Sequence, residues 1–279
     1  MEFQKGHGTG NDFVVLPDPQ GLLELTPELV ARLCDRRFGI GGDGVLRVVR
    51  TSNTDQAPPQ AQGPEFFMDY RNADGSAAAM CGNGARVFAQ YLWDTGLAEA
   101  GPVRFGTRGG VRRAELLPDG RVQVEMGPAV LGEQESATVE AAGRSWPATP
   151  VHVPNPHAVV ILDSLDEAGS LVEAPHLRPA AAFPEGANVE FVVGVKPGRI
   201  AMRVHERGVG ETLSCGTGAC AAAVVHLARS GQSAGRVLVD VPGGQLQVDV
   251  SQGLAVSLTG PVSTVAHGRV DPDWLAQAR

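Results

Sequence analysis

The sequence predicts an α+β protein of two pseudo-symmetric domains, each a curved, mainly antiparallel sheet wrapped around a central helix. The first observation is a repeated motif: Cys-Gly-x-Gly-Ala occurs at 81–85 and again at 215–219, and each copy opens a helix-like run. The second is that each half combines many short β-like runs with one strongly apolar helix. The third is the element order, which lacks the regular strand–helix alternation of a doubly wound fold.

A constant offset extends this repeat beyond the cysteine motifs. Three further pairs of landmarks lie 133 or 134 positions apart: Met68 and Met202, Gly109-Gly110 and Gly243-Gly244, and Gly127-Pro128 and Gly260-Pro261. Scattered landmarks at one offset indicate an internal duplication, and so long a period favours two related domains over a solenoid. We therefore expect an N-terminal domain at 1–126, which the segment 262–279 rejoins, and a C-terminal domain at 127–261.

In the first half, a flexible glycine-rich loop at 6–10 is expected to lead into the first strand. A helix should start at Thr26, because threonine is a good N-cap and Pro27 suits the first helical turn. Its apolar positions continue to Phe38, and the glycines of 39–44 end it. The expected order is strand 11–16, helix 26–38, strand 45–49, a surface loop at 51–65, strand 65–71, helix 85–95, and strands with a hairpin turn within 103–126.

The second half repeats this theme around a helix expected at 218–230. The run 221–228 of that helix is apolar on nearly every face, so the helix should be buried inside its own sheet. Strands are expected before the helix at 157–162, 188–193 and 199–205, and after it at 236–241, 245–250 and 254–259.

Composition excludes several functional classes. A net charge of −8 argues against nucleic acid or an anionic membrane as the main partner. The first residues lack the apolar stretch of a signal peptide, and no run approaches the ~20 apolar residues that span a bilayer. We therefore expect a cytoplasmic protein that contacts neither nucleic acid nor membrane.

No metal or cofactor site is expected. The four cysteines are too few for a disulfide framework, and cysteine and histidine do not occur at zinc-ligand spacing. Cys34 and Cys220 are expected to pack as small apolar residues. There is no nucleotide-binding glycine motif. The sequence alone leaves pyridoxal phosphate open, although the only two lysines, Lys5 and Lys196, lie in no convincing Schiff-base context.

The two cysteine motifs can carry chemistry together. A helix start exposes unpaired N–H groups and about half a positive charge, which should lower a cysteine's pKa below its free value of about 8.5. The same amides form an anion site suited to a carboxylate. Two such motifs on duplicated domains suggest a substrate carboxylate held by both helix starts, with one sulfur on either side of its α-carbon. Removing a proton on one face and returning it on the other would invert that centre.

Several segments of the chain, in order, closely resemble diaminopimelate epimerase, and the match extends to about residue 265. These segments are Gly8-Thr9-Gly10-Asn11-Asp12-Phe13, Arg71-Asn72-Ala73-Asp74-Gly75-Ser76, Cys81 to Arg86, Pro154-Asn155-Pro156-His157, Gly186-Ala187-Asn188-Val189-Glu190 and His205 to Ala219. The resemblance implies this family's fold, with no cofactor.

The resemblance also implies residue roles. Cys81 and Cys215 would be the acid/base pair, with Cys81 the proton donor and Cys215 the acceptor in the L-to-meso direction, and the roles exchanged in reverse. The backbone amides of Gly82-Asn83 and Gly216-Thr217 would bind the carboxylate at the reacting centre. Four asparagines match family positions that hydrogen-bond the substrate: Asn11, Asn72, Asn155 and Asn188.

Three further residues match family positions around the substrate. Arg207 would bind the distal carboxylate, for which a bidentate guanidinium is suited. Glu206 would contact a substrate ammonium, and Glu206 and His157 would tune the thiol pair. One departure is Gly44, because some family members carry a glutamine ligand there.

The resemblance implies conversion of LL- to meso-2,6-diaminopimelate, a precursor of lysine and peptidoglycan, by an isomerase that commonly forms homodimers. One alternative is another cofactor-independent racemase of this fold, acting on a proline derivative or histidine. Two alternatives come from other classes: a non-enzymatic amino-acid binder and a thiol redox protein.

Overall fold

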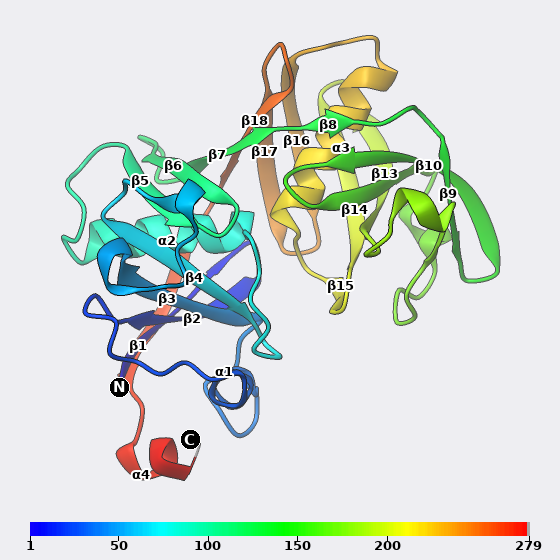
Figure 1. The fold of residues 1–279 in the computed structure, drawn as a ribbon. Helices are drawn as coiled ribbons and strands as arrows, with labels where there is room; N and C mark the ends of the chain where they lie inside the picture. Colours follow the sequence, from blue (N-terminus) through cyan, green and yellow to red (C-terminus); the bar gives the residue numbers. More distant parts are fainter. Residues whose placement is uncertain (278–279) are drawn as a thin grey trace. The chain divides into compact units, whose positions relative to one another are not determined.

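The computed structural model describes residues 1–277 and divides the chain into two compact units (Figure 1). Unit 1 contains Met1–Val124 and the C-terminal segment from Pro261, and unit 2 contains Glu125–Gly260. Among the described residues, no helix is long and apolar enough to span a lipid bilayer.

Unit 1 is a twisted sheet around one long helix, α2 (Gly82–Asp94). Two short helices, α1 (Pro27–Cys34) and α4 (Pro272–Gln277), lie outside this sheet, and two 3-10 turns, Thr51–Asn53 and Pro59–Ala61, interrupt the loop after the third strand. Its strands are β1 (Glu2–Gly8), β2 (Asn11–Pro17), β3 (Gly44–Arg50), β4 (Phe66–Asn72), β5 (Val103–Thr107), β6 (Gly110–Leu116), the start of β7 (Val122–Pro128), which runs on into unit 2 after Val124, and β19 (Ser263–Arg269).

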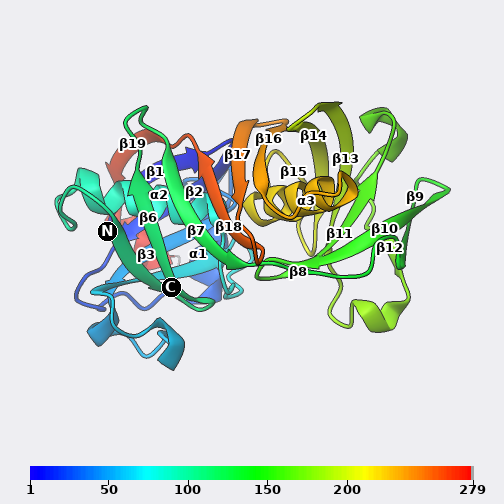
Figure 2. The ribbon, with the colours of Figure 1, turned by 90° about the horizontal axis from the view of Figure 1, so that it is seen from above.

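Unit 2 is likewise a sheet around one long helix, α3 (Gly216–Arg229), as Figure 2 shows. Short 3-10 turns lie at Leu165–Ala168 and Ala180–Ala182. Its strands are β8 (Val130–Leu131), β9 (Ala137–Ala141), β10 (Arg144–His152), β11 (Pro156–Ile161), β12 (His176–Arg178), β13 (Asn188–Lys196), β14 (Arg199–Glu206), β15 (Gly210–Thr212), β16 (Gly235–Val241), β17 (Gly244–Val250) and β18 (Ala255–Gly260).

The two sheets share one strand order, which confirms the predicted duplication. The series β1-β2-β3-β4-β5-β6 in unit 1 corresponds to β10-β11-β13-β14-β16-β17 in unit 2. In both, the second and third strands and the fourth and fifth strands pair parallel, and the other neighbours pair antiparallel. The pattern fits the predicted α+β class with mainly antiparallel pairing.

The register of the strands matches as closely as their order. Thr107 pairs with Gly110 across one tight turn, and Val241 pairs with Gly244 across the equivalent one. Phe13 pairs with Gly44 in unit 1, and His157 pairs with Asn188 in unit 2. Positions 13 and 44 of unit 1 therefore correspond to positions 157 and 188 of unit 2.

The central helices are buried as predicted. Every residue of α3 from Gly216 to Val225 is buried, and only the last turn reaches solvent, because strands of its own sheet surround it. The predicted starts of both helices were late. The first turn of α2 begins at Gly82 rather than Ala85, and that of α3 begins at Gly216 rather than Gly218.

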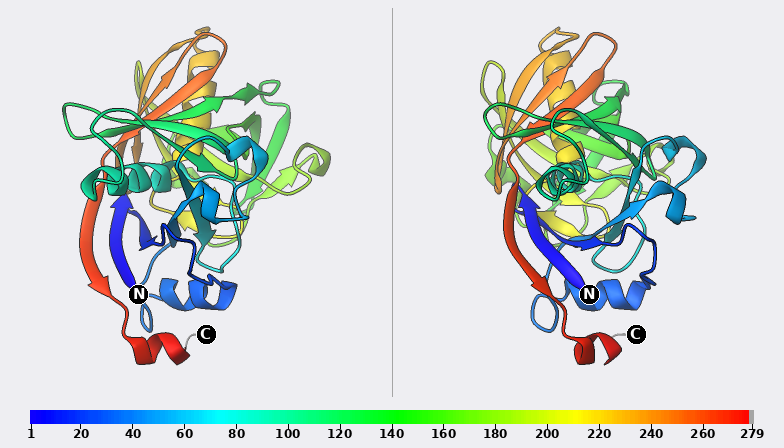
Figure 3. Two further views of the ribbon diagram at one scale, coloured as in Figure 1. Left: turned by 60° about the vertical axis from the view of Figure 1, so that its left-hand side comes forward. Right: turned by 90° about the vertical axis from the view of Figure 1, so that its left-hand side faces the viewer.

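Other predicted elements differ from the structure at the unit 1 periphery. Residues 6–8 are not a loop but the end of β1, which pairs with β2 and with β19 (Figure 3). Helix α1 starts at the predicted N-cap, Thr26, but ends at Cys34 rather than Phe38. The Asp35 carboxylate accepts hydrogen bonds from the backbone N–H groups of the next turn, so the chain leaves the helix and Phe38 is 81% exposed.

Weakly apolar strands account for most of the missed elements. These are β1, β8, β9, β10, β12, β15 and β19, together with the short helix α4. By contrast, Cys34 and Cys220 are both buried, as expected for small apolar side chains.

We predict that Gly75, in the turn after β4, tolerates no side chain. Its φ is +86°, and a Cβ there would lie 2.4 Å from Pro27 Cα, so Gly75→Ala should lower the free energy of unfolding by about 2–3 kcal/mol. Gly120→Ala is the matched control, because φ is +81° and the space around it is open; about 1 kcal/mol is expected there. Urea unfolding of both variants measures the difference, and equal losses would contradict a steric cause.

Candidate active site

In unit 1, Cys81 is the N-cap of α2. Its backbone is extended, with φ −137° and ψ 121°, and its Sγ accepts a hydrogen bond from the Gly84 N–H at 3.4 Å. A Cβ on Gly84 would lie 3.1 Å from Leu46 Cδ2 and 3.5 Å from Phe13 Cζ. Glycine at this position therefore lets the helix start pack closely against the sheet, with the partly buried Cys81 at its N-cap.

Asn11 connects this sulfur to the sheet. Asn11 Oδ1 lies 3.6 Å from Cys81 Sγ and accepts a hydrogen bond from Asn83 Nδ2 at 3.2 Å. Asn11 Nδ2 donates to Asp43 Oδ2 at 2.7 Å. Because an ionised carboxylate only accepts hydrogen bonds, Asp43 fixes which end of the Asn11 amide faces the thiol. Sequence reasoning missed Asp43, although the neighbouring residue, Gly44, was noted as a departure from the family pattern.

An ion-pair network holds Asp43 in place. Arg36 Nη2 lies 2.7 Å from Asp43 Oδ1 and bridges to Asp12, which also pairs with Lys5 Nζ at 2.6 Å. Burial alone would raise the pKa of Asp12, but the hydrogen bonds from Arg36 and Lys5 outweigh burial and lower it.

Asn72 lies at the end of β4, and its amide is engaged within unit 1. Its Oδ1 accepts from the Tyr70 hydroxyl at 2.8 Å, and its Nδ2 donates to Ser76 Oγ at 3.0 Å. Gly44 pairs with Asn72 on the neighbouring strand, and a Cβ on Gly44 would lie 2.5 Å from Arg71 O. The backbone fills this space, so position 44 contributes no side chain here.

In unit 2, Cys215 is the N-cap of α3 with the same geometry. Its Sγ accepts from the Gly218 N–H at 3.4 Å and from Asn188 Nδ2 at 3.6 Å, and it lies 3.4 Å from Thr217 Oγ1. Asn188 Oδ1 in turn accepts from the Arg207 N–H at 2.9 Å, which orients the amide. We call Asn155, His157, Asn188, Glu190, Glu206 and Cys215 the Cys215 half-site, and Asn11, Asp43, Cys81 and Asn83 the Cys81 half-site.

The expectation of a lowered cysteine pKa is wrong for Cys215. Burial, with 5% of the residue exposed, raises its pKa well above the ordinary value, and the negative charges of Glu206 and Glu190 add to the effect. Hydrogen bonds from Thr217 and the Gly218 N–H act in the opposite direction but are outweighed. The helix start therefore contributes less than the surrounding groups, which the local sequence does not reveal.

Glu206 is the second group with a perturbed pKa. Burial raises its pKa, and hydrogen bonds from Thr212 and Cys215 only partly oppose that effect. The Thr212 hydroxyl donates to Glu206 Oε1 at 2.5 Å. A hydrogen-bonded pair of acids, one thiol and one carboxyl, thus lies at the start of α3.

His157 lies in the same half-site, and both of its ring nitrogens are engaged. Nδ1 is 2.7 Å from Glu190 Oε1, and Nε2 is 3.2 Å from Asn155 Oδ1. Both His157 and Glu190 are completely buried. Sequence reasoning gave Glu190 no role of its own, because its contact with His157 depends on the parallel pairing of β11 and β13.

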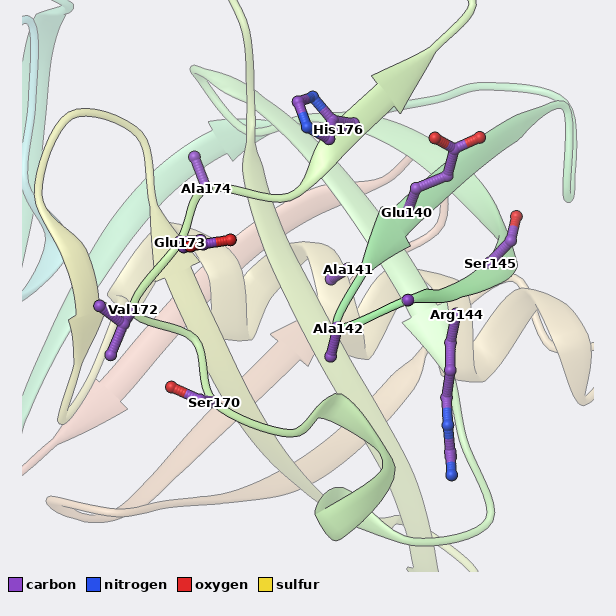
Figure 4. A pocket seen from close by; sticks show the side chains of 11 residues that line it. Glu140, Ala141, Ala142, Arg144, Ser145, Ser170, Val172, Glu173, Ala174 and His176 are labelled. Atoms are coloured by element: carbon purple, nitrogen blue, oxygen red, sulfur yellow. The ribbon is translucent and has the colours of Figure 1, made fainter.

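Arg207 lies at the rim of this half-site. Its side chain is 43% exposed, and its guanidinium donates from Nη1 to Glu185 O at 2.7 Å. The hollow shown in Figure 4 lies elsewhere in unit 2, between the β9–β10 turn and the segment 170–176, and no predicted site residue lines it.

By sequence, the chain is similar to one family. A family model described as diaminopimelate epimerase matches residues 3–132 and 149–265. Curated proteins named diaminopimelate epimerase are 50% identical in Streptomyces coelicolor, over 99% of this chain and 97% of that protein, and 49% identical in Thermobifida fusca, over 97% and 98%.

Solved structures share the fold at much lower identity. A hydroxyproline epimerase from Agrobacterium vitis has a TM-score of 0.70 at 18% identity, covering 98% of this chain and 93% of that one. A PhzF-family protein from Bacillus anthracis has a TM-score of 0.68 at 14% identity, covering 97% and 98%.

We predict that Glu206→Gln lowers the pKa of Cys215. The ionised carboxylate opposes formation of a neighbouring thiolate, so its removal makes ionisation of Cys215 less costly. The measurement is the ultraviolet absorbance of the thiolate against pH, taken as the difference between each protein and its Cys215→Ser derivative. A midpoint that stays unchanged or rises in Glu206→Gln would contradict this electrostatic assignment.

Proposed function

Since this chain belongs to the diaminopimelate epimerase family, we propose that it interconverts LL- and meso-2,6-diaminopimelate by cofactor-independent proton transfer at one α-carbon. The observation that carries the proposal is the pair of cysteine N-caps, Cys81 and Cys215, each at the first turn of a buried helix. The identities of 45–50% are to proteins named diaminopimelate epimerase, whereas the hydroxyproline epimerase shares only the fold.

The hydrogen bonds at the two sulfurs favour different protonation states. Both sulfurs accept the N–H of the glycine three positions on, and Cys215 Sγ also receives an N–H donor from Asn188, which further stabilises a thiolate. Cys81 Sγ faces Asn11 Oδ1, which accepts a hydrogen bond from a thiol. In the LL-to-meso direction, the Cys215 thiolate removes the α-hydrogen as a proton, and the Cys81 thiol donates its proton to the other face of the carbanion. The reverse reaction exchanges these roles.

Glu206 supplies the base strength that this step needs. An α-hydrogen next to a carboxylate is weakly acidic, so its removal needs a thiolate of high proton affinity. Burial and the negative charges of the neighbouring carboxyls give Cys215 that affinity.

The helix starts are proposed to bind the carboxylate of the reacting centre. The N–H groups of the first helical turn have no partner within the helix, so Gly82-Asn83 and Gly216-Thr217 can donate to an anion and stabilise charge on the carbanion. Asn11, Asn72, Asn155 and Asn188 are proposed to hydrogen-bond the substrate, Arg207 its distal carboxylate and Glu206 its ammonium. The support is their place in the family motifs and, for Arg207, its exposed guanidinium.

We also propose that the enzyme works as a homodimer in the cytoplasm and supplies lysine and peptidoglycan precursors. The support for these points is the family membership. Light scattering of the purified protein measures its molar mass directly, and a value near 29.1 kDa would contradict the dimer.

The first test is deuterium incorporation. Wild-type protein incubated with LL-diaminopimelate in deuterated water should place deuterium at the α-position and form the meso isomer. Cys81→Ala and Cys215→Ala should each reduce turnover by about 10³-fold, the scale of a positioned acid–base group. Cys34→Ala, a buried cysteine in α1, is the control and should retain activity. Deuteration of proline or histidine, but not of diaminopimelate, would favour the alternative racemase.

The second test addresses Asp43. Replacing it with alanine removes the acceptor of Asn11 Nδ2, so the amide can turn and present nitrogen to Cys81. We expect kcat/KM to fall by about 10- to 100-fold, the cost of a misplaced polar group. Asp119→Ala, in an exposed hairpin turn, is the control. Equal activity of both variants would show that Asp43 does not position Asn11.

A further inference from the structure

We propose that Glu190 is a positioning residue that anchors the Nδ1–H of His157, so that Nε2 is the ring nitrogen that exchanges protons in the Cys215 half-site. The inference rests on the proposed epimerase function and identifies a residue that makes the two half-sites chemically different.

The anchor is a short, fully buried contact. Glu190 Oε1 lies 2.7 Å from His157 Nδ1, and neither residue is exposed. A carboxylate accepts hydrogen bonds, so the proton of this contact belongs to Nδ1. Within residues 1–277, Glu190 Oε2 has no hydrogen-bond partner. The imidazole is therefore the hydrogen-bond donor to the buried carboxylate, and the carboxylate fixes the orientation of the ring.

The other ring nitrogen lies against a partner that suits either protonation state. Nε2 is 3.2 Å from the Asn155 amide at Oδ1. An asparagine amide presents oxygen to a protonated nitrogen and, after a half-turn, presents NH₂ to an unprotonated one. With Nδ1 held by Glu190, the ring keeps one orientation, and Nε2 is the nitrogen that faces Asn155.

The duplication provides an internal comparison. Val15 pairs with Leu46 between β2 and β3, and Val159 pairs with Glu190 between β11 and β13. Leu46 is thus the unit 1 counterpart of Glu190, as Phe13 is of His157. Unit 1 has an apolar pair where unit 2 has an acid and an imidazole.

Both pairs occupy the same place under the helix start. In unit 1, a Cβ on Gly84 would meet Leu46 and Phe13, whereas in unit 2 a Cβ on Gly218 would lie 2.6 Å from Glu190 Oε1. The packing requirement at this place is met without charge in unit 1. Packing alone does not explain why unit 2 has a carboxylate there, because burying a carboxylate is costly. We attribute it to the chemistry of the adjacent Cys215 half-site.

The titratable groups that face this pair are the two acids of the half-site. Glu206, at the end of β14, and Cys215, at the start of α3, both experience the negative charge of Glu190, which raises the pKa of each. The positive charge of His157 acts against this effect at Glu206. Glu190 and His157 therefore act on Glu206 in opposite directions.

A double-mutant cycle tests the proposal. The variants are Glu190→Leu, His157→Phe and the double variant, which recreates in unit 2 the apolar pair that unit 1 packs. Each single change should lower kcat by about 100-fold, at the lower end of an acid–base contribution. If Glu190 acts through His157, the double variant should be no slower than His157→Phe alone. Multiplying losses would overturn the proposal, as would wild-type kcat and pH profile in Glu190→Leu.

Nitrogen NMR of the imidazole gives a readout that a purely structural role would not change. In wild type, His157 should carry its fixed proton on Nδ1, and Glu190→Leu should show a mixture of tautomers. Glu190→Gln keeps an acceptor oxygen but removes the charge, so it should retain the Nδ1–H tautomer while shifting the pH profile of kcat. A wild-type Nε2–H tautomer would overturn the proposal. Glu140→Gln, on the surface strand β9, is the activity control.

The two hypotheses fail differently. Lack of epimerisation by wild-type protein would remove the proposed function but leave the tautomer measurement standing. Full activity of wild type, with an unchanged tautomer in Glu190→Leu, would remove the role of Glu190 alone.

Discussion

The rest of the structure depends on a cysteine sulfur that caps a buried helix. At each motif, Sγ accepts the N–H of the residue three positions on, Gly84 or Gly218, at 3.4 Å. This places the thiol where the helix exposes its remaining N–H groups, but it requires glycine in the first turn, because sheet side chains lie against that turn. A helix start so poor in intrinsic propensity is held by the surrounding strands, which explains why each helix is enclosed by its own sheet.

The duplication gives both units the same arrangement of strands around a helix, and different residues at a few equivalent positions make the two half-sites different. Register pairs Phe13 with Gly44 and His157 with Asn188, so one unit has an aromatic ring and no side chain where the other has an imidazole and an amide. The amide of Asn188 donates to the sulfur of Cys215. In unit 1 the amide next to the sulfur of Cys81 is that of Asn11, and it presents an oxygen, which accepts. A repeated fold thereby gives one sulfur a donor and the other an acceptor.

The sequence was sufficient to predict the elements with strong local patterns, and its motifs indicated the candidate site residues. The apolar run of α3 and the strands rich in apolar residues were predicted correctly, whereas β1 and β19 were missed because most of their residues are polar or glycine and the two strands pair across more than 250 positions. The candidate site was found through its cysteines and motifs. Asp43 and Glu190 were missed because their partners, Asn11 and His157, are defined only by the pairing of distant strands.

The wrong direction for the pKa of Cys215 has a physical explanation. A helix start stabilises a thiolate by a fixed dipole, but the effect declines within one turn, whereas burial and two nearby carboxyls oppose ionisation. For removing a weakly acidic α-hydrogen this opposition is useful, because a thiolate that is hard to form has a high affinity for the proton it takes. The hydrogen bonds from Asn188 and Gly218 then limit the cost of forming it. Burial makes the Cys215 thiolate a strong base, and the hydrogen bonds at the N-cap lower the free-energy cost of forming it.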